Sequence, residues 1–185
     1  ITNPYGLDAY GFARDPKNDQ IIYAVSAGGG WKSSDGGDTW EPLGDLFGTD
    51  GAWGIVVDPN NSNTLYIGGG RGIYKSTDGG ATWQTKSTII DSEHGCSYPH
   101  GYAIAISPVG DYLYAGTDHG SHLWCESYID EYSGLYRSGD GGETWERVAD
   151  YNLIGTPRAI VPAPSAPHIV YAGGGNGIVK SVDGG

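Results

Sequence analysis

A short motif recurs along this chain and limits the possible folds more than any other feature. Residues 33–40, 76–83 and 138–145 each combine a serine, an aspartate two residues later, a pair of glycines, a threonine and a tryptophan, and a fourth copy begins at Ser181. The aspartate carboxylate can accept backbone N–H groups across a tight turn, and glycine tolerates the positive φ that such turns need. Each copy therefore predicts a turn between two β-strands, with the indole packed over it.

The spacing of the motif indicates a repeat architecture. Consecutive aspartates lie 43, 62 and 43 residues apart. A second set of anchors has spacings of 43, 49 and 56 residues: Pro16, Pro59, Pro108 and Pro164. Such a period is typical of a propeller blade or of a solenoid unit. The stretch from Asp78 to Asp140 is longer because it contains two insertions, at residues 89–101 and 117–133.

Short apolar runs alternate with turn residues inside each unit. Residues 53–57, 64–67 and 73–76 read as strands separated by an Asp-Pro turn and by a glycine-rich turn, and a fourth strand begins at Trp83. Four antiparallel strands per unit are typical of a propeller blade. The sequence predicts an all-β propeller segment over residues 1–185, three and two-thirds blades with boundaries near 7–48, 49–97, 98–153 and 154–185. Because propellers contain about four to eight blades, we expect further blades or another chain to close the fold.

The motif resembles the Asp-box, or BNR-type, repeat of β-propellers such as the xyloglucanase-type glycoside hydrolases and the sortilin-like receptors. The resemblance covers essentially the whole chain. It implies that the aspartate and tryptophan of each copy have structural roles: Asp35, Trp40, Asp78, Trp83, Asp140, Trp145 and Asp183. It is specific for the fold, whereas one fold serves many functions.

The resemblance implies two classes of function. In xyloglucanase-type propellers a catalytic aspartate follows the second strand of a blade in a Tyr-Ala-x-Thr-Asp-x-Gly pattern, and residues 114–120 match it, which makes Asp118 the candidate general base. These enzymes carry the acid on a second, facing propeller, so whether this chain is an enzyme stays open, and we do not expect it to hydrolyse glycans alone. The alternative is a non-catalytic propeller that binds proteins or builds a structure, as in sortilin-like receptors, assembly factors or surface arrays.

The two insertions hold the candidate ligand site. Propeller geometry places both at the blade end opposite the aspartate turns, and they bring aromatic rings beside carboxylates, a combination that suits sugar faces and hydroxyl groups. The candidate ligand-binding residues are Trp53, Tyr98, Trp124, Tyr128 and Glu126. Long polar loops without a ligand are the alternative. The four histidines of the insertions lack the compact spacing of a zinc site, so we expect no metal and no cofactor.

Charge and cysteine content limit the partners. The chain has 22 acidic and 10 basic residues, a net charge of -12, which disfavours nucleic acid and anionic membranes. No apolar run reaches the roughly 18 residues of a membrane helix, so we expect no membrane insertion. Two cysteines in a chain rich in glycine and aromatic residues favour an extracellular or cell-surface location, and Cys96 and Cys125, one in each insertion, are predicted to form a disulfide. The expected partner is an oligosaccharide or a protein ligand.

Overall fold

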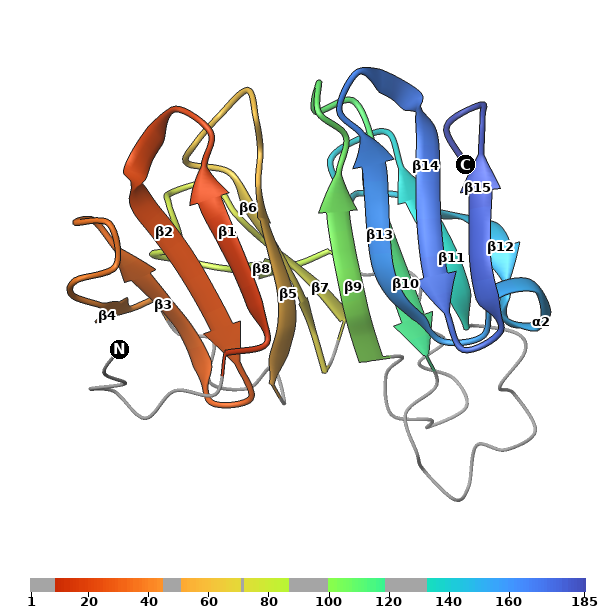
Figure 1. Cartoon of the computed structure of the whole chain (residues 1–185). Helices are drawn as coiled ribbons and strands as arrows, with labels where there is room; N and C mark the ends of the chain where they lie inside the picture. Colours follow the sequence, from red (N-terminus) through yellow and green to blue (C-terminus); the bar gives the residue numbers. More distant parts are fainter. Residues whose placement is uncertain (1–8, 45–50, 71, 87–99, 119–132) are drawn as a thin grey trace.

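The computed structural model describes residues 9–44, 51–70, 72–86, 100–118 and 133–185, which form four antiparallel sheets (Figure 1). The first sheet contains β1 (Gly11–Asp15), β2 (Asn18–Ser26), β3 (Gly29–Ser33) and β4 (Glu41–Pro42). The second contains β5 (Ala52–Val57), β6 (Leu65–Gly69), β7 (Gly72–Ser76) and β8 (Gln84–Thr85). The third contains β9 (His100–Ile106), β10 (Leu113–Asp118), β11 (Gly134–Ser138) and β12 (Glu146–Asp150). The fourth contains β13 (Pro157–Ala163), β14 (Ala166–Gly174) and β15 (Gly177–Ser181).

The sheets stack side by side through their first strands. Strand β1 contacts β5, β5 contacts β9, and β9 contacts β13, and within each sheet the strands follow chain order (Figure 1). Sheets stacked in this way around a row of inner strands form a β-propeller. The predicted all-β propeller segment is confirmed, and its fourth sheet has three strands in the described residues.

The local predictions agree with the structure in the inner strands and differ in two smaller elements. The strands predicted at residues 53–57, 64–67 and 73–76 match the inner strand β5 and its neighbours β6 and β7 to within two residues. The strand predicted to begin at Trp83 is only Gln84–Thr85. A one-turn helix, α2 (Tyr151–Ile154), links the third and fourth sheets and was not predicted. The Asp150 carboxylate caps it by accepting the Leu153 N–H at 2.9 Å.

Alternating side chains give each sheet two faces, and the core lies between facing sheets. We call the face that points to the next sheet in chain order the forward face, and the opposite one the backward face. The forward faces carry Tyr23, Tyr66 and Tyr114 at equivalent places on β2, β6 and β10, and these side chains are 1%, 4% and 0% exposed. Burial raises the pKa of Tyr66 and of Tyr114 to about 12. The first three sheets therefore bury a tyrosine against the next sheet.

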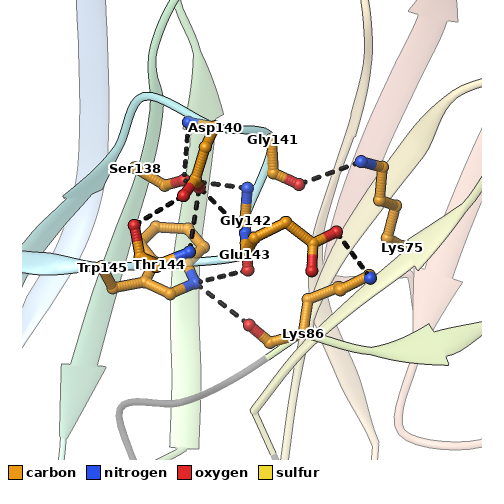
Figure 2. A network of polar contacts seen from close by, with 9 residues as sticks. All are labelled: Lys75, Lys86, Ser138, Asp140, Gly141, Gly142, Glu143, Thr144 and Trp145. Atoms are coloured by element: carbon orange, nitrogen blue, oxygen red, sulfur yellow. Dashed lines mark hydrogen bonds and ion pairs between the residues drawn. The ribbon is translucent and has the colours of Figure 1, made fainter.

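The aspartate turns, residues 33–40, 76–83 and 138–145, join the third and fourth strands of the first three sheets. The Asp78 carboxylate accepts hydrogen bonds from the Thr82 backbone N–H at 2.9 Å, the Thr82 hydroxyl at 2.5 Å and the Ser76 hydroxyl at 2.8 Å. Gly79 and Gly80 have φ values of 73° and 94°. The third turn repeats this network around Asp140 (Figure 2). Each turn is thus closed by hydrogen bonds within the motif itself.

Acid is expected to weaken these turns. Hydrogen bonds from Thr82 and Ser76 lower the pKa of Asp78 from 3.8 to about 2, and those from Thr39 and Ser33 do the same for Asp35. A carboxyl group with a lowered pKa in the folded state stabilises the fold above its unfolded pKa, and this contribution is lost as the pH falls through the folded pKa. We expect the free energy of unfolding in urea to decline between about pH 4 and pH 2 because of these groups. The decline should be shallower in Asp78→Asn, and identical pH slopes for the two proteins would contradict the prediction.

Candidate functional site

The two ends of the sheets differ in what they carry. Strands β1, β5, β9 and β13 run toward the end that bears the aspartate turns, so their first residues lie at the opposite end (Figure 1). We call this opposite end the rim. Trp53 is the second residue of β5 and Asp118 is the last residue of β10, so the backbone of both lies at the rim. The aspartate turns lie at the other end of the same strands.

A pair of stacked aromatic rings lies at the rim between the first and second sheets. The ring centroids of Tyr10 and Trp53 are 4.8 Å apart and their planes are inclined by 21°. Tyr10 precedes β1, donates its backbone N–H to the Val25 carbonyl at 2.8 Å, and is 51% exposed. Gly51 has a φ of 98°, and a Cβ there would lie 3.5 Å from the Trp53 ring. The backbone therefore approaches the indole closely: Trp53 is half-buried and its indole nitrogen is buried, while the Tyr10 ring stacked on it is exposed.

Tyr10 and Trp53 occupy one repeat position, six residues before the anchor proline of each unit. The same position holds Tyr102 in the third sheet, whose side chain lies outside the described residues, and Arg158 in the fourth, which is exposed. Sequence reasoning selected Trp53 as a candidate ligand-binding residue and did not select Tyr10. The shared repeat position was the signal for the stack, because residues at one position of adjacent sheets are neighbours around the inner strands.

Asp118 lies at the edge of what the structure describes. Its Cα pairs with that of His100 at the rim end of β9 and β10. The preceding residue, Thr117, is 2% exposed and its hydroxyl donates to the Gly134 carbonyl at 3.4 Å. The strand that leads to Asp118 is thus held in the third sheet. The role of Asp118 as a general base stays a prediction.

Most of the other predicted site residues lie outside the described residues: Tyr98, Trp124, Tyr128, Glu126, Cys96 and Cys125. Their place at the rim and the pairing of the two cysteines stay predictions. The intact mass under non-reducing conditions checks the disulfide, since a bonded pair leaves no thiol for an alkylating reagent.

Other features of the described residues do not add to this site. A cavity of about 280 Å³ lies between the third and fourth sheets and is lined largely by apolar side chains such as Leu135, Val148 and Val179. It belongs to different sheets from the Tyr10–Trp53 pair. Among the described residues no group of three or more His, Cys, Asp or Glu side chains is placed to hold a metal ion. The described part of the chain also has no helix with the length and apolar character to cross a membrane.

Comparisons with known proteins identify the fold. No protein-family model matches the chain, and no curated protein matches it significantly. A GH74 enzyme of Niastella koreensis has a similar structure, with a TM-score of 0.73 and 23% identity over 95% of this chain and 28% of the enzyme. The GH74 xyloglucanase of Xanthomonas campestris gives a TM-score of 0.68 and 17% identity over 94% of this chain and 28% of the enzyme. A structure of YCF48 bound to D1 peptide gives a TM-score of 0.55 and 17% identity over 90% of this chain and 51% of YCF48.

The chain therefore spans little more than a quarter of these two GH74 enzymes and about half of YCF48. At identities below 25% a structural likeness shows the fold and leaves activity open. The resemblance to the xyloglucanase-type propellers holds at the level of the fold, and the chain is a segment of a β-propeller with sheets like those of the GH74 enzymes.

Proposed function

We propose that this chain is an extracellular Asp-box propeller segment that binds oligosaccharides at its rim. The observation that carries the proposal is the exposed ring of Tyr10 stacked on the half-buried Trp53, with 4.8 Å between ring centroids, at the end of the inner strands opposite the aspartate turns. A flat aromatic surface suits the C–H face of a pyranose ring. The net charge of -12 favours a neutral glycan over an anionic one. The likeness to GH74 propellers, one of which is a xyloglucanase, makes xyloglucan oligosaccharides the first ligands to try.

Catalysis needs a second group in this proposal. An inverting hydrolase requires an acid and a base about 6.5–9.5 Å apart on opposite sides of the scissile bond. Asp118 is our candidate base, and the resemblance assigns the acid to a facing propeller. Glycan binding without turnover is therefore what we expect of this chain alone. Asp118→Asn should abolish turnover in a protein that also supplies the acid and should leave oligosaccharide affinity within about twofold.

The aromatic pair provides the direct test of binding. Tyr10→Ala and Trp53→Ala should each weaken oligosaccharide binding by about 1 kcal/mol or more, roughly a fivefold rise in Kd, because each removes a contact surface for the sugar ring. Isothermal titration with xyloglucan oligosaccharides measures this effect. Val109→Ala is the matched control, because Val109 is also exposed, at 52%, but lies between β9 and β10 at the aspartate-turn end. No measurable binding, or equal losses in all three variants, would contradict the proposal.

A non-catalytic protein-binding propeller is the second candidate. The observation in its favour is the likeness to YCF48, a propeller whose structure was solved with a peptide, with a TM-score of 0.55. The two candidates differ in the effect of the rim variants. A glycan site predicts loss of saccharide binding, whereas a peptide site predicts binding to extended peptides and none to oligosaccharides.

A further inference from the structure

The interfaces between sheets share a polar contact that the sequence motifs did not reveal. On the second sheet, the Lys75 ammonium lies 5.4 Å from the centroid of the Tyr66 ring. It donates to the Gly141 carbonyl of the third aspartate turn at 3.1 Å (Figure 2). On the third sheet, Arg137 and the Tyr114 hydroxyl both donate to the Gly184 carbonyl, each at 2.9 Å. Gly141 and Gly184 are the first glycines of their motifs. In both interfaces a cation of the forward face donates to the carbonyl of the first glycine in the next aspartate motif, and on the third sheet the tyrosine hydroxyl donates to the same carbonyl.

The fourth sheet has the same groups on its forward face, and they are exposed. Lys180 lies 5.6 Å from the centroid of the Tyr171 ring, close to the distance found for Lys75 and Tyr66. Tyr171 is 41% exposed, whereas its three equivalents are buried. Val161 and Ile178 share this face through the strand register and are 56% and 83% exposed. No described sheet covers this forward face.

The backward face of the first sheet is its counterpart. Phe12 is 64% exposed, although the equivalent Ile55 and Ile160 on β5 and β13 are 4% and 9% exposed. The first glycine of the first aspartate turn, Gly36, is also exposed, while its equivalent Gly184 is buried by the third sheet. An apolar side chain and a glycine carbonyl are the two features that a forward face contacts in this protein.

We propose that the forward face of the fourth sheet docks on the backward face of the first sheet in a second copy of this chain. Lys180 and Tyr171 of one copy would then meet the Gly36 carbonyl of the other, as Lys75 meets Gly141. Phe12 would be covered by Val161 and Ile178, as Ile160 is covered by the third sheet. This contact repeats, between two chains, the geometry that the chain already uses between its own sheets.

Each copy contributes a different face to the contact. In a dimer with two-fold symmetry this contact forms twice, so the forward face of each copy meets the backward face of the other. Two copies, each with the four sheets that the described residues form, would supply eight, which lies within the range of about four to eight blades found in propellers. The expected assembly is therefore a closed dimer with two such contacts, in which the forward face of the fourth sheet and the backward face of the first sheet are covered in both copies.

Analytical ultracentrifugation of the full chain over a concentration series tests the proposal, and the expected species is a dimer. Ile178→Asp with Lys180→Glu alters the forward face, and Phe12→Asp alters the backward face. Each variant alone should raise the dimer dissociation constant by at least about tenfold, because it places a charge against an apolar or carbonyl partner. Val109→Asp, an exposed control at the aspartate-turn end, should leave it unchanged.

Mixing the two interface variants separates this model from a contact between two identical faces. The forward face of the Phe12→Asp protein and the backward face of the double variant are both intact, so an equimolar mixture should form a one-to-one heterodimer through a single contact. Far-UV circular dichroism and thermal unfolding of each variant check that the sheets are retained. A monomer at all concentrations would overturn the proposal, as would a dimer insensitive to both variants or a mixture that stays monomeric.

Discussion

Tyr114→Ala is expected to destabilise the protein by about 4 kcal/mol, in the range for removing a large buried aromatic side chain. Tyr114 is fully buried between the third and fourth sheets, and its hydroxyl donates to the Gly184 carbonyl at 2.9 Å. Alanine would leave a cavity and remove the donor from a shared acceptor. For a chain of this size the loss corresponds to a decrease in Tm of about 8–16 °C. Tyr114→Phe should isolate the hydroxyl contribution at about 1 kcal/mol.

Tyr171→Ala is the matched control for that prediction. Tyr171 occupies the same repeat position and register on β14 as Tyr114 on β10, but it is 41% exposed. At a protein concentration at which the chain is monomeric, we expect a loss below about 1 kcal/mol, because little apolar area is removed from contact with protein. Thermal unfolding of both variants gives the comparison. Equal losses would show that stacking on the next sheet does not determine the contribution of this tyrosine.

Gly44→Ala should cost about 3 kcal/mol or more, at the upper end for overpacking, because the obstacle is backbone. Gly44 follows β4, and its N–H donates to the Gly80 carbonyl of the second aspartate turn at 2.8 Å. A Cβ at this position would lie 1.8 Å from the Ala81 carbonyl oxygen. That atom cannot rotate away like a flexible side chain, so the link between the first two sheets must move. Urea unfolding of the variant measures the loss.

Gly173→Ala provides the comparison for Gly44. Gly173 lies in β14, and a Cβ there would meet nothing within 4 Å. The substitution is expected to be neutral or to stabilise by up to about 1 kcal/mol through the reduced entropy of the unfolded chain. If both variants lost stability equally, the crowding at Gly44 would not be the cause. Sequence reasoning had no signal for this difference, since both residues lie in ordinary glycine-containing segments.

The aspartate turns show how far local sequence reaches. Asp78, Ser76 and Thr82 lie within one motif, and every hydrogen bond that the Asp78 carboxylate accepts comes from within it. Such a turn needs no distant partner, so the motif predicts it wherever it recurs. The inner strands were predicted for the same reason, because their alternation and flanking turns are properties of a few consecutive residues. The aromatic stack of the candidate site could not be predicted from local sequence in this way, because Tyr10 and Trp53 belong to two different sheets.

The repeat, the turns and the two faces of each sheet follow from local sequence. Which of these faces are covered depends on the stacking of the sheets. Tyr114 and Tyr171 occupy one repeat position and have the same strand register, yet one is buried and the other is 41% exposed. Phe12 and Ile55 differ in the same way on the backward faces. The physical reason is that alternation sets the direction in which a side chain points, whereas its burial depends on whether another sheet is stacked against that face.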